Sequence, residues 1–164
     1  MKKDVLEKVT LDWLKDRINK TPDINLSGIF LKKNLSTINH SYISNHPLIA
    51  ALDFTCDITA IIQYESSKKF DLILINRYSK SIGIREIGEM RVISNLVNPY
   101  FSAIISPTGH SSVINNIVVN EQISNELFSY SNKHFYIFSI DNQGEINKES
   151  IIPANFRSVF PLSS

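Results

Sequence analysis

Two apolar stretches separated by a helical pattern constrain the fold more than any other feature. The first is Phe70 to Asn76 (Phe-Asp-Leu-Ile-Leu-Ile-Asn), and the second runs from Tyr100 to Ser106. Short, nearly continuous apolar runs are typical of strands that are covered on both faces. Residues 83–97 between them have apolar side chains at helical spacing and end at Asn98-Pro99. The later part of the chain therefore predicts a βαβ-like arrangement in a mixed sheet.

The first half of the chain supplies a helix and two further strands. Asp4 to Asn19 is predicted as an amphipathic helix, with Trp13 buried on its apolar side. Gly28 to Leu31 reads as a short strand. Leu52 to Ile62 alternates between apolar and polar residues, which predicts a strand with one face of each kind. We expect this strand to form a hairpin with Phe70 to Asn76.

The second half continues with a helix and a strand. His110 to Tyr130 is predicted as one helix, His134 to Ile140 as a strand, and Asp141 to Gly144 as a turn. The tail from Glu145 has no clear pattern. No repeat or linker divides the chain, so we expect a single α/β domain over residues 1–164.

Composition limits the classes of function. A length of 164 residues, with 43% hydrophobic and 20% charged residues, is ordinary for one globular domain. The formal net charge of +1 gives no global field toward nucleic acid or an anionic membrane. The one cysteine, Cys56, cannot form an intramolecular disulfide, and no segment has the length of a membrane span. These features predict a cytoplasmic protein that does not act at a membrane.

Three passages follow one another in the chain: residues 56–62, residues 72–77, and residues 82–90 with 103–109. In this order they resemble the PD-(D/E)xK nucleases, the group of restriction endonucleases, Holliday-junction resolvases and RecB-like nucleases. Residues 56–62 (Cys-Asp-Ile-Thr-Ala-Ile-Ile) look like the family strand that carries the first metal-binding aspartate. Leu72 to Arg77 lies where the family has its acid-x-Lys motif. Residues 82–90 and 103–109 are similar to the following helix and strand. The resemblance implies a restriction-endonuclease-like core, ordered αβββαβ with an added αβ.

The resemblance also implies a site, which here is degenerate. Asp57 takes the place of the first metal-binding aspartate. Aligning Arg77 with the family lysine puts Ile75 where the second acid should be, and no acid-x-Lys triplet occurs between Phe70 and Lys80. An arginine stays protonated, so Arg77 could bind a phosphate, together with Lys80, but could not act as a base. We expect Asp57, Ile75 and Arg77 to face the same side of the sheet.

A displaced acid would rescue the site. Some family members carry the second acid on the following helix, where Glu86 and Glu89 share a face, and Glu7 lies on the stripe of the first helix that faces the family's site. Asp57, Glu7 and Glu86 would then hold Mg²⁺, with Asp57 and Glu86 as the catalytic pair. Each acid has a simpler explanation, because Glu86 and Glu89 also suit an exposed helix face and Glu7 suits a first helical turn.

Other polar motifs do not indicate catalysis. His40, His46, His110 and His134 lack metal-ligand spacing and suit turns or helix caps. Ser111 or Ser112 is better explained as a helix N-cap than as a nucleophile.

Three functions therefore stay open. The first is a non-catalytic or weakly active nuclease-like module that docks DNA or a protein, including a second copy, in repair, replication or mobile-element function. The second is an active Mg²⁺-dependent DNA endonuclease. The third is an assembly subunit without nucleic-acid contact. Because the second acid is missing, we favour the first function, without catalysis and without a cofactor.

Overall fold

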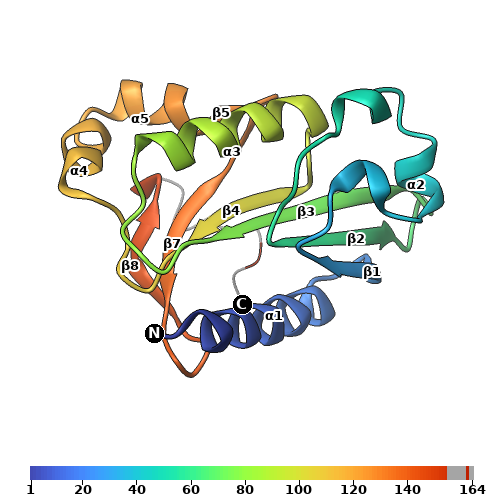
Figure 1. The fold of residues 1–164 in the computed structure, drawn as a ribbon, viewed down its shortest axis with the longest axis horizontal. Helices are drawn as coiled ribbons and strands as arrows, with labels where there is room; N and C mark the ends of the chain where they lie inside the picture. The colour runs from blue at the N-terminus through green and yellow to red at the C-terminus, as the bar shows by residue number, and fades with distance from the viewer. Residues whose placement is uncertain (155–161, 163–164) are drawn as a thin grey trace.

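A six-stranded mixed sheet, ordered β1-β2-β3-β4-β7-β8, forms the centre of the computed structural model, which describes residues 1–154 and 162 (Figure 1). Its strands are β1 (Ile24–Leu31), β2 (Ile58–Tyr64), β3 (Phe70–Arg77), β4 (Phe101–Ile105), β7 (Tyr136–Ile140) and β8 (Ile146–Ile152). Two short strands, β5 (Ser129–Tyr130) and β6 (Lys133–His134), pair separately. The helices are α1 (Lys3–Lys20), α2 (Ser41–Ser44), α3 (Ile84–Val97), α4 (Ser112–Val118) and α5 (Glu121–Phe128), with 3₁₀ turns η1 (Leu35–Thr37) and η2 (Ile49–Ala51).

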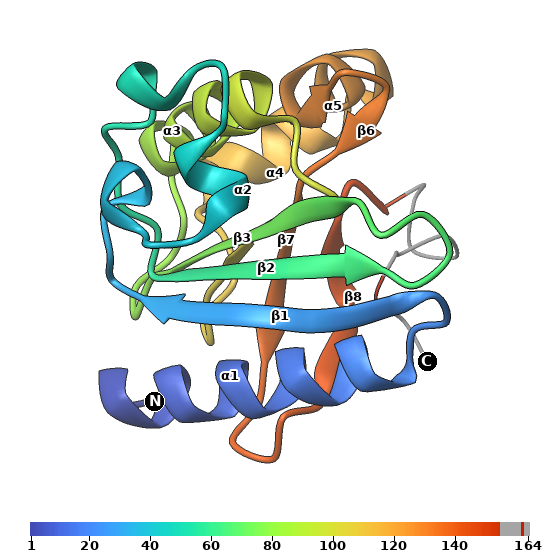
Figure 2. The same cartoon turned by 90° about the vertical axis from the view of Figure 1, so that its right-hand side faces the viewer.

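The strand directions confirm the predicted mixed sheet. β1, β2 and β3 pair antiparallel, which includes the expected hairpin, and β7 and β8 are also antiparallel. β3, β4 and β7 are parallel, connected first through α3 and then through α4 and α5. Helix α1 covers one face of the sheet, and α2, α3, α4 and α5 cover the other (Figure 2). The protein is thus α/β, with helices on both faces of the sheet.

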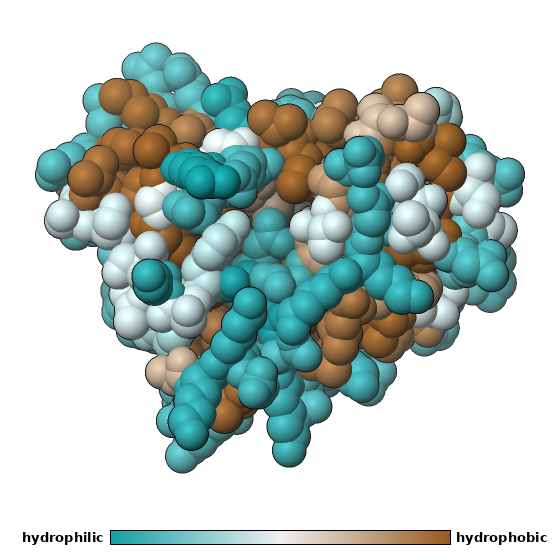
Figure 3. Space-filling view, viewed as in Figure 1, coloured by the Kyte–Doolittle hydropathy of each residue, from teal (hydrophilic) through white to brown (hydrophobic). Residues whose placement is uncertain are grey.

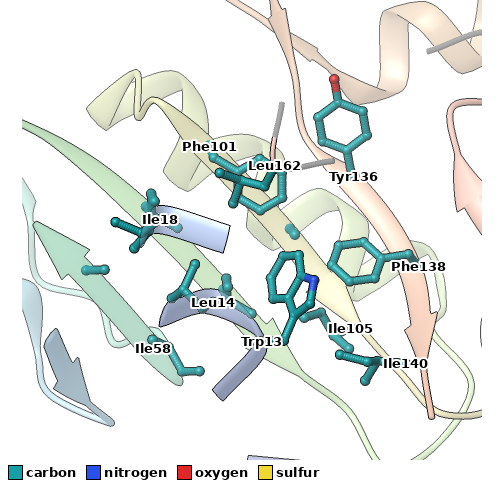
Figure 4. Packing of buried hydrophobic residues seen from close by; sticks show 14 of the residues in the cluster. Trp13, Leu14, Ile18, Ile58, Phe101, Ile105, Tyr136, Phe138, Ile140 and Leu162 are labelled. Carbon is teal, nitrogen blue, oxygen red and sulfur yellow. The ribbon is translucent and has the colours of Figure 1, made fainter. Parts of the chain in front are cut away.

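The packing of α1 against the sheet depends on Trp13, which is only 4% exposed, as the sequence predicted. Its indole lies 5.3 Å from the Phe138 ring and 6.5 Å from the Phe101 ring, measured between centroids (Figure 4). Leu14 and Ile18 continue the same buried side of α1. Trp13 thus holds α1 against β4 and β7, and Glu7 near the start of α1 reaches Arg77 at the end of β3.

The prediction of one strand over residues 52–62, with an apolar and a polar face, is wrong in its start and in its polar face. The strand begins at Ile58, and Thr59 and Ile61 are as buried as Ile58. Cys56 belongs to the core cluster under α2 and η1, whereas Ile58 belongs to the cluster under α1. The chain therefore changes sides at Asp57, and the alternation seen across this point is not that of one strand. β2 is a central strand covered on both faces, without the expected polar face.

The single helix expected for residues 110–130 is two helices. The Asn120 side chain accepts a hydrogen bond from the Ile123 amide at 3.1 Å and so begins α5. An asparagine at an N-cap competes with continuation of the preceding helix. The predicted strand over 134–140 begins at Tyr136, because His134 belongs to β6, and β1 is longer than predicted.

Part of the unassigned tail is the edge strand β8. The preceding turn is as predicted: the Asp141 carboxylate accepts hydrogen bonds from the Gln143 and Glu145 amides, and Gly144 has a φ of 87°. Beyond residue 154 only Leu162 is among the described residues, so the rest of the tail lies outside them.

Candidate functional site

Asp57 joins the start of β2 to the end of β3. Its Oδ2 accepts a hydrogen bond of 2.8 Å from the backbone N–H of Arg77, and its own N–H donates to Asn76 Oδ1 at 3.1 Å. The β-hairpin register, in which Ile58 pairs with Ile75, places Asp57 opposite these residues. Asp57 is thus held in place by the backbone and by one side-chain amide.

Four charged residues meet beside this junction and are called the ion-pair cluster: Glu7, Lys32, Asp57 and Arg77. The Arg77 side chain is only 3% exposed, and its Nη2 lies 2.8 Å from Glu7 Oε2 and 3.4 Å from Asp57 Oδ1. Lys32 Nζ lies 2.5 Å from the same Glu7 oxygen. Two carboxylates and two cations face one another, so the ion-pair cluster has no formal net charge.

The cations stabilise the ionised form of Glu7. Its hydrogen bond from Lys32, followed by that from Arg77, lowers the pKa of Glu7 from 4.5 to about 2. Arg77 Nε and Nη1 are buried and have no hydrogen-bond partner in the described part of the chain. The contacts of Nη2 therefore hold the guanidinium, and three of its five N–H donors, those on Nε and Nη1, have no partner among the described residues.

A pocket of about 530 Å³ opens beside the ion-pair cluster. Asp57, Asn76 and Arg77 line it from the sheet, and Tyr78, Glu89 and Ile93 are among the other residues of its wall. Burial, and then the charge of Glu89, raise the pKa of Tyr78 to about 12, so its hydroxyl stays a hydrogen-bond donor. A larger groove lies elsewhere, between α1 and the turn at residues 142–145.

The structure brings some of the predicted residues together. Ile75 and Arg77 both face α1, Ile75 within the core and Arg77 at Glu7. Asp57 contacts Arg77 from the strand junction, since it precedes the first residue of β2. The position expected for the second acid is therefore occupied by a fully buried isoleucine.

Glu86 and Lys80 lie apart from this arrangement. Glu86 accepts a hydrogen bond of 2.9 Å from the Gly83 N–H at the start of α3, while Glu89 lines the pocket and pairs with Arg85. Lys80 is exposed and is not part of the pocket wall. Among residues 1–154 and 162, no three His, Cys, Asp or Glu side chains are grouped so that they could hold a metal ion.

Glu7 and Asp57 would have to give up protein cations in order to hold a divalent metal ion. Such an ion needs several oxygen ligands with spare negative charge. Glu7 and Asp57 both pair with Arg77, and Glu7 also pairs with Lys32, so the charge of both carboxylates is already balanced by protein cations.

Lys32 and Asn76 are site residues that sequence reasoning missed. Lys32 follows β1 with a positive φ of 50°, in a polar stretch without a legible pattern. Asn76 was assigned only to the end of a strand. Neither residue has a local signal, because each gains its role from a partner far along the chain.

Two histidines accept hydrogen bonds from nearby backbone amides, and one serine lies at the start of a helix. The side chains of His40 and His46 accept hydrogen bonds from the amides of Tyr42 and Leu48, at 3.1 and 3.2 Å. Ser111 is the N-cap of α4, although its hydroxyl makes no capping bond.

Comparison with protein-family models found no match, and comparison with curated proteins found no significant match. No helix among the described residues is both long and apolar enough to cross a membrane.

Proposed function

We propose that this protein is a non-catalytic module with a restriction-endonuclease-like core, and that it works by docking a protein partner. The support for the fold is the order of elements α1, β1, β2, β3, α3, β4, which is the order expected from the resemblance to PD-(D/E)xK nucleases. The support for the loss of catalysis is the ion-pair cluster.

Arg77 is the observation that carries the proposal. Its buried guanidinium lies between Glu7 and Asp57, the two carboxylates that the resemblance assigns to a metal. A protein cation there supplies the positive charge that a bound Mg²⁺ would bring. It cannot activate water, because arginine offers no coordination site and does not release its proton near neutral pH.

The same burial argues against a DNA-binding role for Arg77. The Arg77 side chain is only 3% exposed and its Nη2 is paired with Glu7 and Asp57, so a phosphate would have to compete with two carboxylates for the same cation. The formal charge of +1 adds no general attraction to DNA. Docking of a protein is therefore favoured over docking of DNA.

A cleavage assay tests the proposal. The full chain is incubated with supercoiled, linear and single-stranded DNA in Mg²⁺ or Mn²⁺, beside Asp57→Ala. We expect no metal-dependent product above that of Asp57→Ala. Cleavage that requires the metal and is lost in Asp57→Ala would overturn the non-catalytic assignment.

A second candidate function is an active metal-dependent endonuclease, and one observation favours it. Asp57 and Glu89 line the same pocket, and Lys3 is also in its wall. Glu89 would then provide the displaced acid in place of Glu86. If the cleavage assay is positive, Glu89→Gln should abolish the activity, whereas Glu86→Gln should leave it.

A further inference from the structure

The outer side of α3 carries an apolar stripe that no described residue covers. The members of this α3 stripe recur at every fourth position: Ile84, Gly88, Val92 and Leu96. Residues at this spacing lie along one side of a helix. Ile84 is 51% exposed, Val92 60% and Leu96 38%, whereas Ile87 and Met90 on the inner side are fully buried.

The apolar surface extends over the neighbouring helices. Ile123 of α5, which packs beside α3, is 50% exposed, and Val119, just after α4, is 83% exposed. Figure 3 shows hydrophobic areas over this layer, separated by hydrophilic side chains, and a mostly hydrophilic surface over α1. Residues 92–132 contain no lysine or arginine. The cations on α3 itself, Arg85 and Arg91, are accompanied by Glu86 and Glu89, so the surface has no excess of positive charge for phosphate or an anionic lipid and suits a protein partner.

Gly88 makes a notch in the centre of the α3 stripe. A Cβ atom added at Gly88 would have nothing within 4 Å. Because the distance between packed helices depends on the side chains at their contact, a glycine here lets a second helix approach closely. Glycine within a helix costs about 1 kcal/mol relative to alanine, and close packing by another helix is one way to offset that cost.

The charges beside the α3 stripe are complementary to a second copy of themselves. Arg85 and Glu89 are exposed by 83% and 47% and pair with each other at 2.9 Å. If two α3 helices pack antiparallel about a two-fold axis at Gly88, Arg85 of each copy comes within roughly 3 Å, along the helix, of the level of Glu89 of the other. Ile84 and Val92 are each four residues from Gly88, so Ile84 of one copy lies at the same level along the helix as Val92 of the other.

We propose that the α3 stripe is the interface of a homodimer in which two α3 helices pack antiparallel around Gly88. The proposal deepens the docking role and rests on it. A stable interface buries about 1,200–2,000 Å² in total. One helix provides only part of this area, and in each copy the exposed Val119 and Ile123 beside α3 would add to the contact.

Sedimentation equilibrium of the full chain over a wide concentration range tests the proposal. We expect a mass that rises from 18.7 kDa toward twice that value. Val92→Glu should weaken dimerisation about tenfold or more, because an unpaired carboxylate would be buried twice. Val5→Glu is the matched control, since Val5 is a 41% exposed valine on the opposite layer, and it should leave the dimer unchanged.

Charge reversal and cross-linking test the geometry. Arg85→Glu and Glu89→Arg should each weaken the dimer, and the double variant should restore it. Gly88→Cys should form a disulfide-linked dimer under mild oxidation, because the two cysteines would meet at the two-fold axis. Val5→Cys lies outside the proposed interface and should not. The natural Cys56 is buried and should give no background. A chain that is monomeric at every concentration, or a dimer that Val92→Glu does not weaken, overturns the proposal. Failure here leaves the cleavage result standing, so the two proposals fail separately.

Discussion

Replacing Arg77 with methionine should destabilise the protein by about 2 kcal/mol. Methionine fills a similar length of buried space but removes the cation. The loss of the 2.8 Å contact with Glu7 and the longer contact with Asp57 leaves two carboxylates near one another. A charge-assisted hydrogen bond contributes roughly 1.5–3 kcal/mol, and Lys32 still balances part of the charge. The substitution also removes Nε and Nη1, two buried polar atoms without a hydrogen-bond partner among the described residues, and this offsets part of the lost stability.

The effect is measurable as a shift in melting temperature. For 164 residues the entropy of unfolding is roughly 0.34 kcal/mol/K, so 2 kcal/mol corresponds to a decrease of about 6 °C. Chemical denaturation followed by circular dichroism gives the free energy directly. Lys20→Met is the control, because its exposed ion pair with Asp16 should contribute less than about 0.5 kcal/mol. An Arg77→Met protein as stable as the wild type would contradict a stabilising role for the ion-pair cluster.

Three further predictions concern pH, packing and reactivity. The pKa of Glu7 is lower in the folded protein than its ordinary value, so its contribution to stability is full above about pH 4.5 and is lost as the pH falls toward 2. Glu7→Gln should therefore cost about 1–2 kcal/mol at pH 7, allowing for partial solvent exposure, and almost nothing near pH 2; a difference that does not depend on pH would refute this. Trp13→Ala should cost about 3–5 kcal/mol by denaturation, against less than 0.5 for the exposed Val5→Ala, and equal losses would mean that α1 is not anchored by Trp13. Burial raises the pKa of the Cys56 thiol to about 12, so it should react with a disulfide reagent only after denaturation, and rapid native reaction would contradict its burial.

Elements with strong local patterns could be predicted from the sequence. The helix over α1, the apolar runs of β3 and β4, and α3 between them were all expected near their observed positions. The start of β2 could not be found in this way, because the alternation from Leu52 to Ile62 hides a change of sides at Asp57. Strand β8 has three consecutive exposed residues and, within the described part of the chain, pairs with β7 alone, so it lacks the apolar pattern of a central strand.

The candidate site could be predicted only at the positions that the resemblance to PD-(D/E)xK nucleases singles out. Glu7, Asp57 and Arg77 were singled out through the resemblance, yet the sequence does not reveal that Arg77 pairs with both acids. That pairing depends on how α1 lies across the sheet, which Trp13 determines by contacts with β4 and β7. The three-residue spacing of Gly83 and Glu86 is typical of a hydrogen bond at the start of a helix, and this bond holds the Glu86 carboxylate away from the site.

The response of melting temperature to Mg²⁺ tests most directly whether Arg77 takes the place of a metal. Wild type and Arg77→Met are melted with and without Mg²⁺, beside Asp57→Ala/Arg77→Met. The wild type should show no shift. Arg77→Met removes the cation between Glu7 and Asp57 and leaves only Lys32 to compete for Glu7, so at a Mg²⁺ concentration about tenfold above the Kd it should gain about 1.4 kcal/mol, or roughly 4 °C, and the double variant should not. A wild type that Mg²⁺ stabilises as strongly as Arg77→Met would contradict the account.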